Sequence, residues 1–178
     1  MEIDFRPALL SIIKEPPPNP LPEGVKAPGL GPRKKANYAN DLRQWAEFCG
    51  AELHPDAGRA RKDPRLLTQA ALVAKDQGRF REYHYPAFRA RWADARDISD
   101  PEVVRRLLAG AGLDAGAALE RAQSDELRER LDAESRAAIE RGVFGAPTLF
   151  VGDEMFWGND RFELVRYYIQ KSGTGGAV

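Results

Sequence analysis

The sequence predicts a mixed α/β protein that is mostly helical. Apolar residues recur at helical spacing over much of residues 33–141, a hairpin pattern follows at 148–157, and a last helical pattern covers 161–170. A chain of 178 residues is long enough to bury one core. We therefore expect a single domain over residues 1–178.

A strand, a helix and a loop are predicted, in that order, within residues 2–32. Residues 2–5 alternate polar and apolar side chains, which favours a short strand, and the apolar residues 8–13 favour a buried helix. Residues 14–32 are rich in proline and glycine, which excludes a regular element. This loop is either a surface linker or an ordered cover over a binding site.

A helix is predicted over residues 33–49. Its apolar side chains fall three and four residues apart and form one stripe, which consists of Tyr38, Leu42, Trp45, Ala46 and Cys49. Because such a stripe normally faces a core, we expect Cys49 to be a buried thiol. The residues that follow, 52–55, are expected to form a short strand.

Two aspartate–proline pairs mark the starts of further helices. Asp63-Pro64 and Asp100-Pro101 each place a capping carboxylate before a proline in the first turn. The first of these helices is expected to end near Gly78. The second is expected to end at Gly110 or Gly112.

An aromatic helix is predicted between them, over residues 80–92. We expect its aromatic face to belong to the core rather than to a cofactor site; the face consists of Phe80, Tyr83, His84, Phe88 and Trp92. The lone His84 on that face is not expected to be catalytic. A short helix is then predicted from Leu113-Asp114 to about Gln123.

A long helix is predicted from a cap at Ser124 through Arg141, and a hairpin follows it. The side chains expected to be buried in this helix are Leu127, Leu131, Ala138 and Ile139. A strand is predicted over 148–151, directly after Ala146-Pro147. Gly152-Asp153 is predicted to form a two-residue hairpin turn, and 154–157 is predicted to be the return strand.

The last helix is predicted to follow Gly158. Asn159 or Asp160 can cap it. Phe162, Val165 and Ile169 are expected to face inward, and residues 172–178 are expected to be a frayed tail.

Composition argues against several functional classes. Lysines plus arginines equal aspartates plus glutamates, 27 each, so no net field favours nucleic acid or an anionic membrane. No apolar run approaches the roughly 20 residues that span a bilayer, and no signal peptide is expected, which favours a cytoplasmic protein. The single cysteine excludes an internal disulfide and a C-x-x-C redox pair, and two distant histidines do not suggest a metal site.

Residues 142–161 read G-V-F-G-A-P-T-L-F-V-G-D-E-M-F-W-G-N-D-R. This pattern resembles the 2-hydroxychromene-2-carboxylate isomerase family, which is related to kappa-class glutathione transferases and to DsbA-like thioredoxin folds. Weaker similarity covers residues 5–10, 79–84 and 96–102. The resemblance implies a thioredoxin-like α/β fold in which 33–141 is a helical insertion and 142–171 is a cis-proline hairpin with the terminal helix.

The resemblance also implies a glutathione site. The residues it assigns to glutathione binding are Ala146, Pro147, Trp157, Gly158, Asn159 and Asp160. A cis Ala146-Pro147 bond would turn the Ala146 backbone toward an extended peptide, as in strand addition. A helix N-terminus near Asn159 favours a carboxylate, and the Asp160 carboxylate can meet an ammonium, so the pair suits the zwitterionic γ-glutamyl end.

The implied activity is a glutathione-dependent cis–trans isomerisation of a small aromatic substrate, in which a transient glutathione adduct forms and then breaks. A kappa-like glutathione transferase and a non-catalytic, shortened thioredoxin-like protein that binds a peptide or partner are the alternatives. The family's first strand and helix, with a serine beside the glutathione sulfur, have no counterpart here, so no catalytic residue is assigned. A sheet edge left open in this way is expected to be filled in a homodimer.

Overall fold

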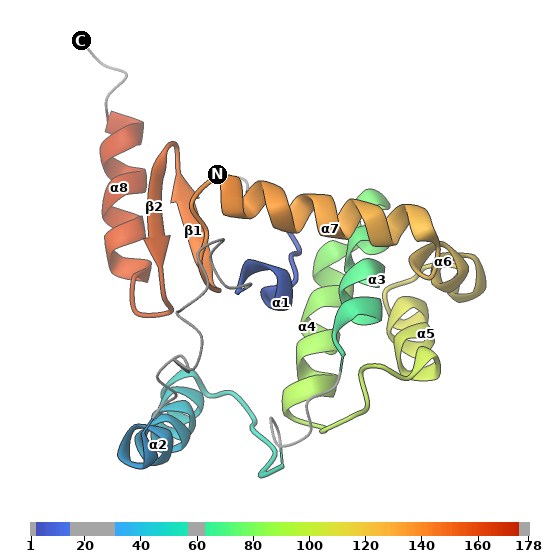
Figure 1. Ribbon diagram of the computed structural model, residues 1–178, viewed down its shortest axis with the longest axis horizontal. Coiled ribbons are helices and arrows are strands. Elements are labelled where there is room, and N and C mark those ends of the chain that lie inside the picture. Colours follow the sequence, from blue (N-terminus) through green and yellow to red (C-terminus); the bar gives the residue numbers. More distant parts are fainter. Residues whose placement is uncertain (1–2, 15–30, 57–62, 175–178) are drawn as a thin grey trace, which may run out of the picture. The chain divides into compact units, whose positions relative to one another are not determined.

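The computed structural model describes residues 3–14, 31–56 and 63–174 (Figure 1). Its elements are α1 (Leu10–Ile13), α2 (Pro32–Cys49), α3 (Arg65–Asp76), α4 (Phe80–Trp92), α5 (Pro101–Gly110), α6 (Ala115–Ala122), α7 (Asp125–Glu140), β1 (Thr148–Val151), β2 (Glu154–Trp157) and α8 (Phe162–Thr174).

The chain divides into two compact groups of residues. The helical group contains residues 1–7 and 16–131, and the hairpin group contains residues 8–15 and 132–178. Helix α7 begins in the first group and ends in the second. The expectation that residues 1–178 form one domain with an insertion at 33–141 stays a prediction.

The helical group is built on small and branched side chains that pack closely. Helix α3 contacts α4, α5 and α6, and its inner face is rich in alanine, which lets helix backbones approach. The side chains with no exposed surface include Ala70, Val73, Val104, Leu108, Leu127 and Leu131. This core confirms the burial of Leu127 and Leu131 that was predicted for the first half of α7.

The predicted capping side chains are confirmed, although α3 begins at Arg65, one residue after the proline that was expected in its first turn. The Asp63 and Asp100 carboxylates accept hydrogen bonds from the Arg65 and Glu102 amides, both at 2.9 Å. The Asp114 carboxylate accepts from the Gly116 and Ala117 amides, and the Ser124 hydroxyl accepts from the Leu127 amide at 3.2 Å. Each capping side chain therefore satisfies an amide that has no partner within its own helix.

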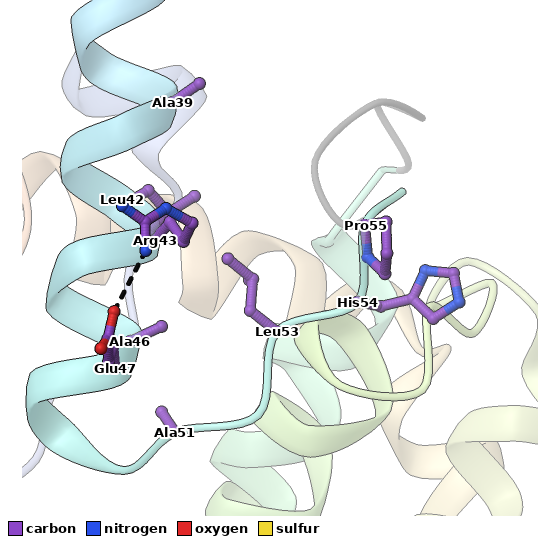
Figure 2. Close-up of a pocket in the computed structure, with 9 residues that line it drawn as sticks. All are labelled: Ala39, Leu42, Arg43, Ala46, Glu47, Ala51, Leu53, His54 and Pro55. Carbon is purple, nitrogen blue, oxygen red and sulfur yellow. Dashed lines mark hydrogen bonds and ion pairs between the residues drawn. The ribbon is translucent and has the colours of Figure 1, made fainter.

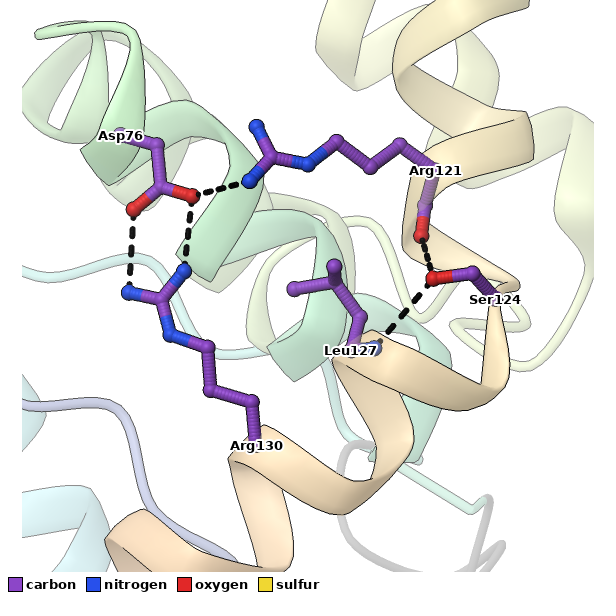
Figure 3. A network of polar contacts seen from close by, with 5 residues as sticks. All are labelled: Asp76, Arg121, Ser124, Leu127 and Arg130. Carbon is purple, nitrogen blue, oxygen red and sulfur yellow. Dashed lines mark hydrogen bonds and ion pairs between the residues drawn. The ribbon is translucent and has the colours of Figure 1, made fainter.

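A charged clamp joins three helices of this group (Figure 3). Arg130 of α7 donates two hydrogen bonds to the Asp76 carboxylate of α3, at 2.7 and 3.0 Å, and Arg121 of α6 donates a third at 2.8 Å. The hydrogen bonds from Arg130, with the charges of both arginines, lower the pKa of Asp76 against the opposing effect of burial.

Helix α2 does not bury its apolar stripe as predicted. Tyr38 is 64% exposed and Cys49 is an exposed free thiol, while Leu42, Trp45 and Ala46 are only partly buried. The buried thiol expected at Cys49 is therefore wrong. The spacing identified a helix correctly, but in the described chain no element packs over that stripe closely enough to cover it.

Neither short strand predicted in the first third of the chain is present. Residues 3–5 and 52–55 lie in no sheet, since β1 and β2 are the only strands among the described residues and they pair with each other. A strand requires a partner ladder, which local alternation cannot supply. Most of the proline-rich loop predicted over 14–32 lies outside the described residues.

The hairpin group contains the predicted hairpin in the predicted register. Strands β1 and β2 are antiparallel, with Thr148 opposite Trp157 and Val151 opposite Glu154. Helix α8 lies beside them (Figure 1) and covers one face, where Val165 is buried.

Helix α1 is held to the second half of α7 within the same group. The Leu9 amide donates to the Ser135 hydroxyl at 2.9 Å, and Leu9 and Ser135 are both buried. This bond joins residues that are 126 positions apart in the chain.

Three predictions for the long and last helices are wrong. Ile139 is 41% exposed and Phe162 is 55% exposed, although both were expected to face inward. Helix α8 continues to Thr174 and therefore includes the first three residues, 172–174, of the segment expected to fray. Apolar spacing alone did not identify which side of each helix faces a neighbour.

Candidate functional site

The six residues that the resemblance assigns to glutathione lie on two arms of one hairpin. The first arm, Ala146-Pro147, precedes β1, and the second, residues 157–160, follows from the end of β2. The Gly158 amide donates to the Pro147 carbonyl at 3.1 Å, which joins the arms directly. The peptide bond between Ala146 and Pro147 is cis, as the resemblance implied.

Ala146 offers an open backbone edge. Ala146 and Pro147 are both exposed. Within the described residues, neither the amide nor the carbonyl of Ala146 takes part in a backbone hydrogen bond. An extended peptide could therefore pair with this edge without displacing a bond of the fold.

Trp157 is held against a glycine that leaves no room for a side chain. A Cβ atom placed on Gly145 would lie 2.5 Å from the Trp157 Nε1 atom, a distance that real structures essentially exclude. Gly145 is buried, whereas Trp157 is 49% exposed. The glycine thus allows an exposed indole ring to rest on the backbone just before Ala146.

A second glycine forms a cradle at the other arm. Gly158 has a φ of +115°, and a Cβ atom there would lie 2.5 Å from the Asp160 Oδ1 atom. Its missing side chain therefore lets the Asp160 carboxylate fold back over the turn. The other carboxylate oxygen is 3.1 Å from the Arg161 guanidinium, in an ion pair whose side chains are each 52% exposed.

The helix start lies slightly beyond the predicted position. Helix α8 begins at Phe162, so the cap position is Arg161 rather than Asn159 or Asp160, which lie in the preceding turn. Glu163 adds a negative charge in the first turn, although it pairs with Arg166 at 3.3 Å. The Gly158 amide is already used within the fold, which leaves Asn159 and Asp160 as the polar groups of this arm.

Sequence reasoning missed Phe144 and Gly145 as members of this neighbourhood. The Phe144 and Trp157 ring centroids are 5.1 Å apart, and Phe144 is 55% exposed. A glycine directly before Ala146-Pro147 was the available signal, because glycine is required where a ring approaches the backbone closely.

The helical group contains a pocket of its own. A pocket of about 550 Å³ opens between α2 and the segment after it (Figure 2), and its lining is mostly apolar. Arg43 and Glu47 in this lining pair with each other at 3.1 Å, and the His54 Nδ1 atom accepts a hydrogen bond from the Asp56 amide. Its polar groups therefore already have partners, and no sequence motif points to it.

His84 lies in an aromatic stack of the helical group. Its ring is 4.9 Å from that of Phe80 and 4.7 Å from that of Phe88, measured between centroids. Burial among these rings lowers the pKa of His84. This environment matches the structural role predicted for the residue.

Metal-binding clusters and membrane-spanning helices are both absent from the described residues. These residues contain no group of three histidine, cysteine, aspartate or glutamate side chains arranged to hold a metal ion. None of their helices has both the length and the apolar character needed to cross a membrane.

The fold and the hairpin site define a thioredoxin-fold protein of the DsbA type. Residues 1–170 match the family model of the DSBA-like thioredoxin domain, and the chain belongs to that family. The predicted fold class is thereby confirmed.

Individual relatives support the more specific resemblance to 2-hydroxychromene-2-carboxylate isomerases. The chain is 35% identical over 140 residues to a 2-hydroxychromene-2-carboxylate isomerase from Pseudomonas sp. (strain C18), an alignment that covers 77% of this chain and 61% of the relative. It is 25% identical over 189 residues to human glutathione S-transferase kappa 1, covering 98% and 80%. The chain thus spans less than two thirds of the length of that isomerase.

A solved structure agrees with these relatives. A selenomethionine form of 2-hydroxychromene-2-carboxylate isomerase superimposes with a TM-score of 0.71 at 27% identity, covering 93% of this chain and 78% of the other. The family resemblance inferred from residues 142–161 is confirmed.

Proposed function

We propose that this chain binds glutathione at the hairpin and acts as a glutathione-dependent isomerase of the 2-hydroxychromene-2-carboxylate type. The observation that carries the proposal is the hydrogen bond between Gly158 and Pro147. It places the open backbone edge of Ala146 beside the turn that bears Asp160. Glutathione needs both features, since it is a short extended peptide with a zwitterionic end.

The residues present fit the cofactor. The amide and carbonyl of Ala146 would pair with the cysteinyl residue, and the Asp160 carboxylate would pair with the γ-glutamyl ammonium. The existing ion pair between Asp160 and Arg161 does not prevent this. Both of its side chains are half exposed, and such pairs contribute only about 0–1 kcal/mol, so a bound ammonium can replace or share the contact.

Bound glutathione would supply a thiol that can add reversibly to a conjugated double bond, which permits rotation about that bond. The role of this chain is to orient the tripeptide. Trp157, fixed by Gly145, would shield one side of the site from water, while Asp160 and Asn159 hold the charged end. Among the described residues we assign no catalytic side chain to the thiol.

A kappa-type glutathione transferase is the second candidate. The human kappa-class relative aligns with 98% of this chain. The same site would then serve a different electrophile, and the thioether would be the product instead of an intermediate. Activity with an isomerase substrate and with a chlorodinitrobenzene acceptor separates the two candidates.

The assembly and location of the protein are also proposals. We expect a homodimer, and we expect it in the cytoplasm. Among the described residues β1 and β2 form a two-stranded sheet, so each of these strands has an edge that another chain could pair with. Light scattering at working concentration measures the oligomeric state, and a monomer would contradict the dimer.

Calorimetric titration of glutathione tests the site. We expect saturable binding that Asp160→Ala weakens by about tenfold or more, equivalent to about 1.4 kcal/mol. Asp153→Ala is the matched control, because Asp153 is an exposed carboxylate in the hairpin turn of the same group. A folded protein that binds no glutathione, or that loses affinity equally in both variants, would contradict the proposal.

A further inference from the structure

The Thr148 hydroxyl makes a contact at the hairpin site that involves none of the six residues assigned to glutathione. Thr148 is the first residue of β1, and its hydroxyl donates a hydrogen bond to the Gly145 carbonyl, three residues earlier, at 2.7 Å. The contact is partly buried, which strengthens it relative to a bond in open water. Threonine carries two heavy atoms on its Cβ and has a stiff χ1 angle, so its hydroxyl has a defined direction.

Gly145 is held from both strands of the hairpin. Thr148 lies directly opposite Trp157, so their side chains share one face of the sheet. The Trp157 indole ring occupies the space in which a Gly145 side chain would lie, while Thr148 holds the carbonyl of the same residue. Gly145 is also buried. The backbone directly before Ala146 is therefore fixed by one side chain of β1 and by one side chain of β2.

This fixed backbone determines where the Ala146 amide points. The Gly145 carbonyl and the Ala146 N–H belong to one planar peptide unit, and because this unit is trans the two groups point in opposite directions. A bond that fixes the carbonyl therefore fixes the N–H as well. Among the described residues the Ala146 N–H takes part in no backbone hydrogen bond, so it remains available as a donor.

The hydrogen bond from Thr148 also makes the Ala146 amide a better donor. A hydrogen bond accepted by a carbonyl polarises the peptide unit, which strengthens the bond that the N–H of this unit can donate. On the far side of Ala146, the Pro147 carbonyl accepts a hydrogen bond from the Gly158 amide at 3.1 Å. Ala146 thus lies between two anchored carbonyls, which keeps its N–H and C=O in place for pairing with one extended peptide.

We propose that Thr148 is a positioning residue: its hydroxyl, acting through the Gly145 carbonyl, aims the Ala146 N–H at a backbone carbonyl of an extended peptide bound at this edge. The identification of that carbonyl as the cysteinyl carbonyl of glutathione rests on the proposed function. The direction of the amide does not, because it follows from contacts within the chain. Thr148 acts only through Gly145 and is not a catalytic residue.

Residual dipolar couplings measured by NMR test the direction of the amide in the free protein. Thr148→Val keeps the β-branched shape and removes the hydroxyl, so we expect the Ala146 N–H coupling to change while that of Val151, later in β1, stays the same. Thr148→Ser keeps the hydroxyl and should leave both couplings unchanged. Thr68→Val is the matched control, because the Thr68 hydroxyl donates a similar bond, at 2.8 Å, to the Pro64 carbonyl in the helical group.

Glutathione titrations test the consequence for binding. By calorimetry, Thr148→Val should weaken glutathione binding by about fivefold or more, the size expected for one hydrogen bond, whereas Thr148→Ser and Thr68→Val should stay within about twofold of the wild type. Saturating glutathione should also move the Ala146 amide proton downfield in the wild type and by less in Thr148→Val, because the stronger hydrogen bond produces the larger shift.

An unchanged Ala146 coupling in Thr148→Val would overturn the proposal, and so would a loss of affinity in Thr148→Ser or Thr68→Val as large as that in Thr148→Val. The same proteins separate this proposal from the proposed function. A wild-type protein that binds no glutathione removes the proposed function alone, and the coupling then decides the role of Thr148. Glutathione binding that Thr148→Val leaves unchanged removes the positioning role alone.

Discussion

The core of the helical group and the cis-proline end of the hairpin group use their side chains in opposite ways. In the helical group, leucine, valine and alanine are fully buried between helices, and charged residues such as Asp76 and Arg130 hold helices together. At the cis-proline end of the hairpin group, Phe144 and Trp157 stay about half exposed, and the closest packing occurs at Gly145 and Gly158. The first arrangement provides stability, whereas the second presents a shaped surface, which is why we place the functional site in the hairpin.

The largest expected effect tests burial in the helical group. Leu127→Ala should lower the free energy of unfolding by about 2–5 kcal/mol, because Leu127 has no exposed surface and its loss leaves a cavity. Leu164 of α8 is 46% exposed, so Leu164→Ala should lower the free energy of unfolding by less than about 1 kcal/mol. Urea titrations followed by circular dichroism measure both changes. Similar losses of unfolding free energy in the two variants would contradict the contrast between buried and exposed side chains.

The next effect tests the glycine packing of the hairpin. Gly145→Ala should cost about 1–3 kcal/mol and alter Trp157 fluorescence, because its Cβ atom would collide with the indole ring. Gly110→Ala in α5 meets open space and should be neutral or stabilising by up to about 1 kcal/mol. Thermal melts measure the change in stability, and emission spectra measure the change in Trp157 fluorescence. An unchanged Gly145→Ala protein would show that the close contact is not required.

A smaller, pH-dependent effect tests the clamp at Asp76. Asp76→Asn should cost about 1–2 kcal/mol at pH 7, since charged hydrogen bonds to Arg130 and Arg121 are weakened. The pKa of Asp76 is lowered by folding, so its contribution is complete above the unfolded value of about 3.9 and is lost as the pH falls through the lower folded value.

Urea midpoints at pH 7 and near pH 2.5 measure this dependence. The difference between wild type and Asp76→Asn should shrink at the lower pH. Glu102→Gln serves as the control, because Glu102 pairs with Arg105 at the exposed surface and its loss should leave the urea midpoint essentially unchanged at both pH values. A difference that stays constant with pH would contradict the clamp.

The smallest effect concerns Cys49. As an exposed thiol it should react fully with a disulfide reagent in the native protein, and Cys49→Ser should change the free energy of unfolding by less than about 0.5 kcal/mol. Reaction only after addition of denaturant would instead support the buried thiol that the apolar stripe of α2 predicted.

Much of the site could be predicted because its signals are local or belong to a family motif. The turn at Gly152-Asp153 fixed the hairpin register, and the resemblance of residues 142–161 identified the cis bond before Pro147. The stacking of Trp157 on Gly145 and of Phe144 on Trp157 could not be predicted. Those contacts depend on how the chain before the hairpin returns over its surface.

The sequence by itself determined the helix starts, the hairpin and the family, because capping, turn geometry and motif spacing act within a few residues of the chain. Only the tertiary structure decided which apolar stripes are buried, as the exposed face of α2 and the buried face of α3 demonstrate. It also decided the partners of Asp76, which are 45 and 54 residues away. Burial and long-range pairing depend on neighbours that periodicity within one segment does not specify.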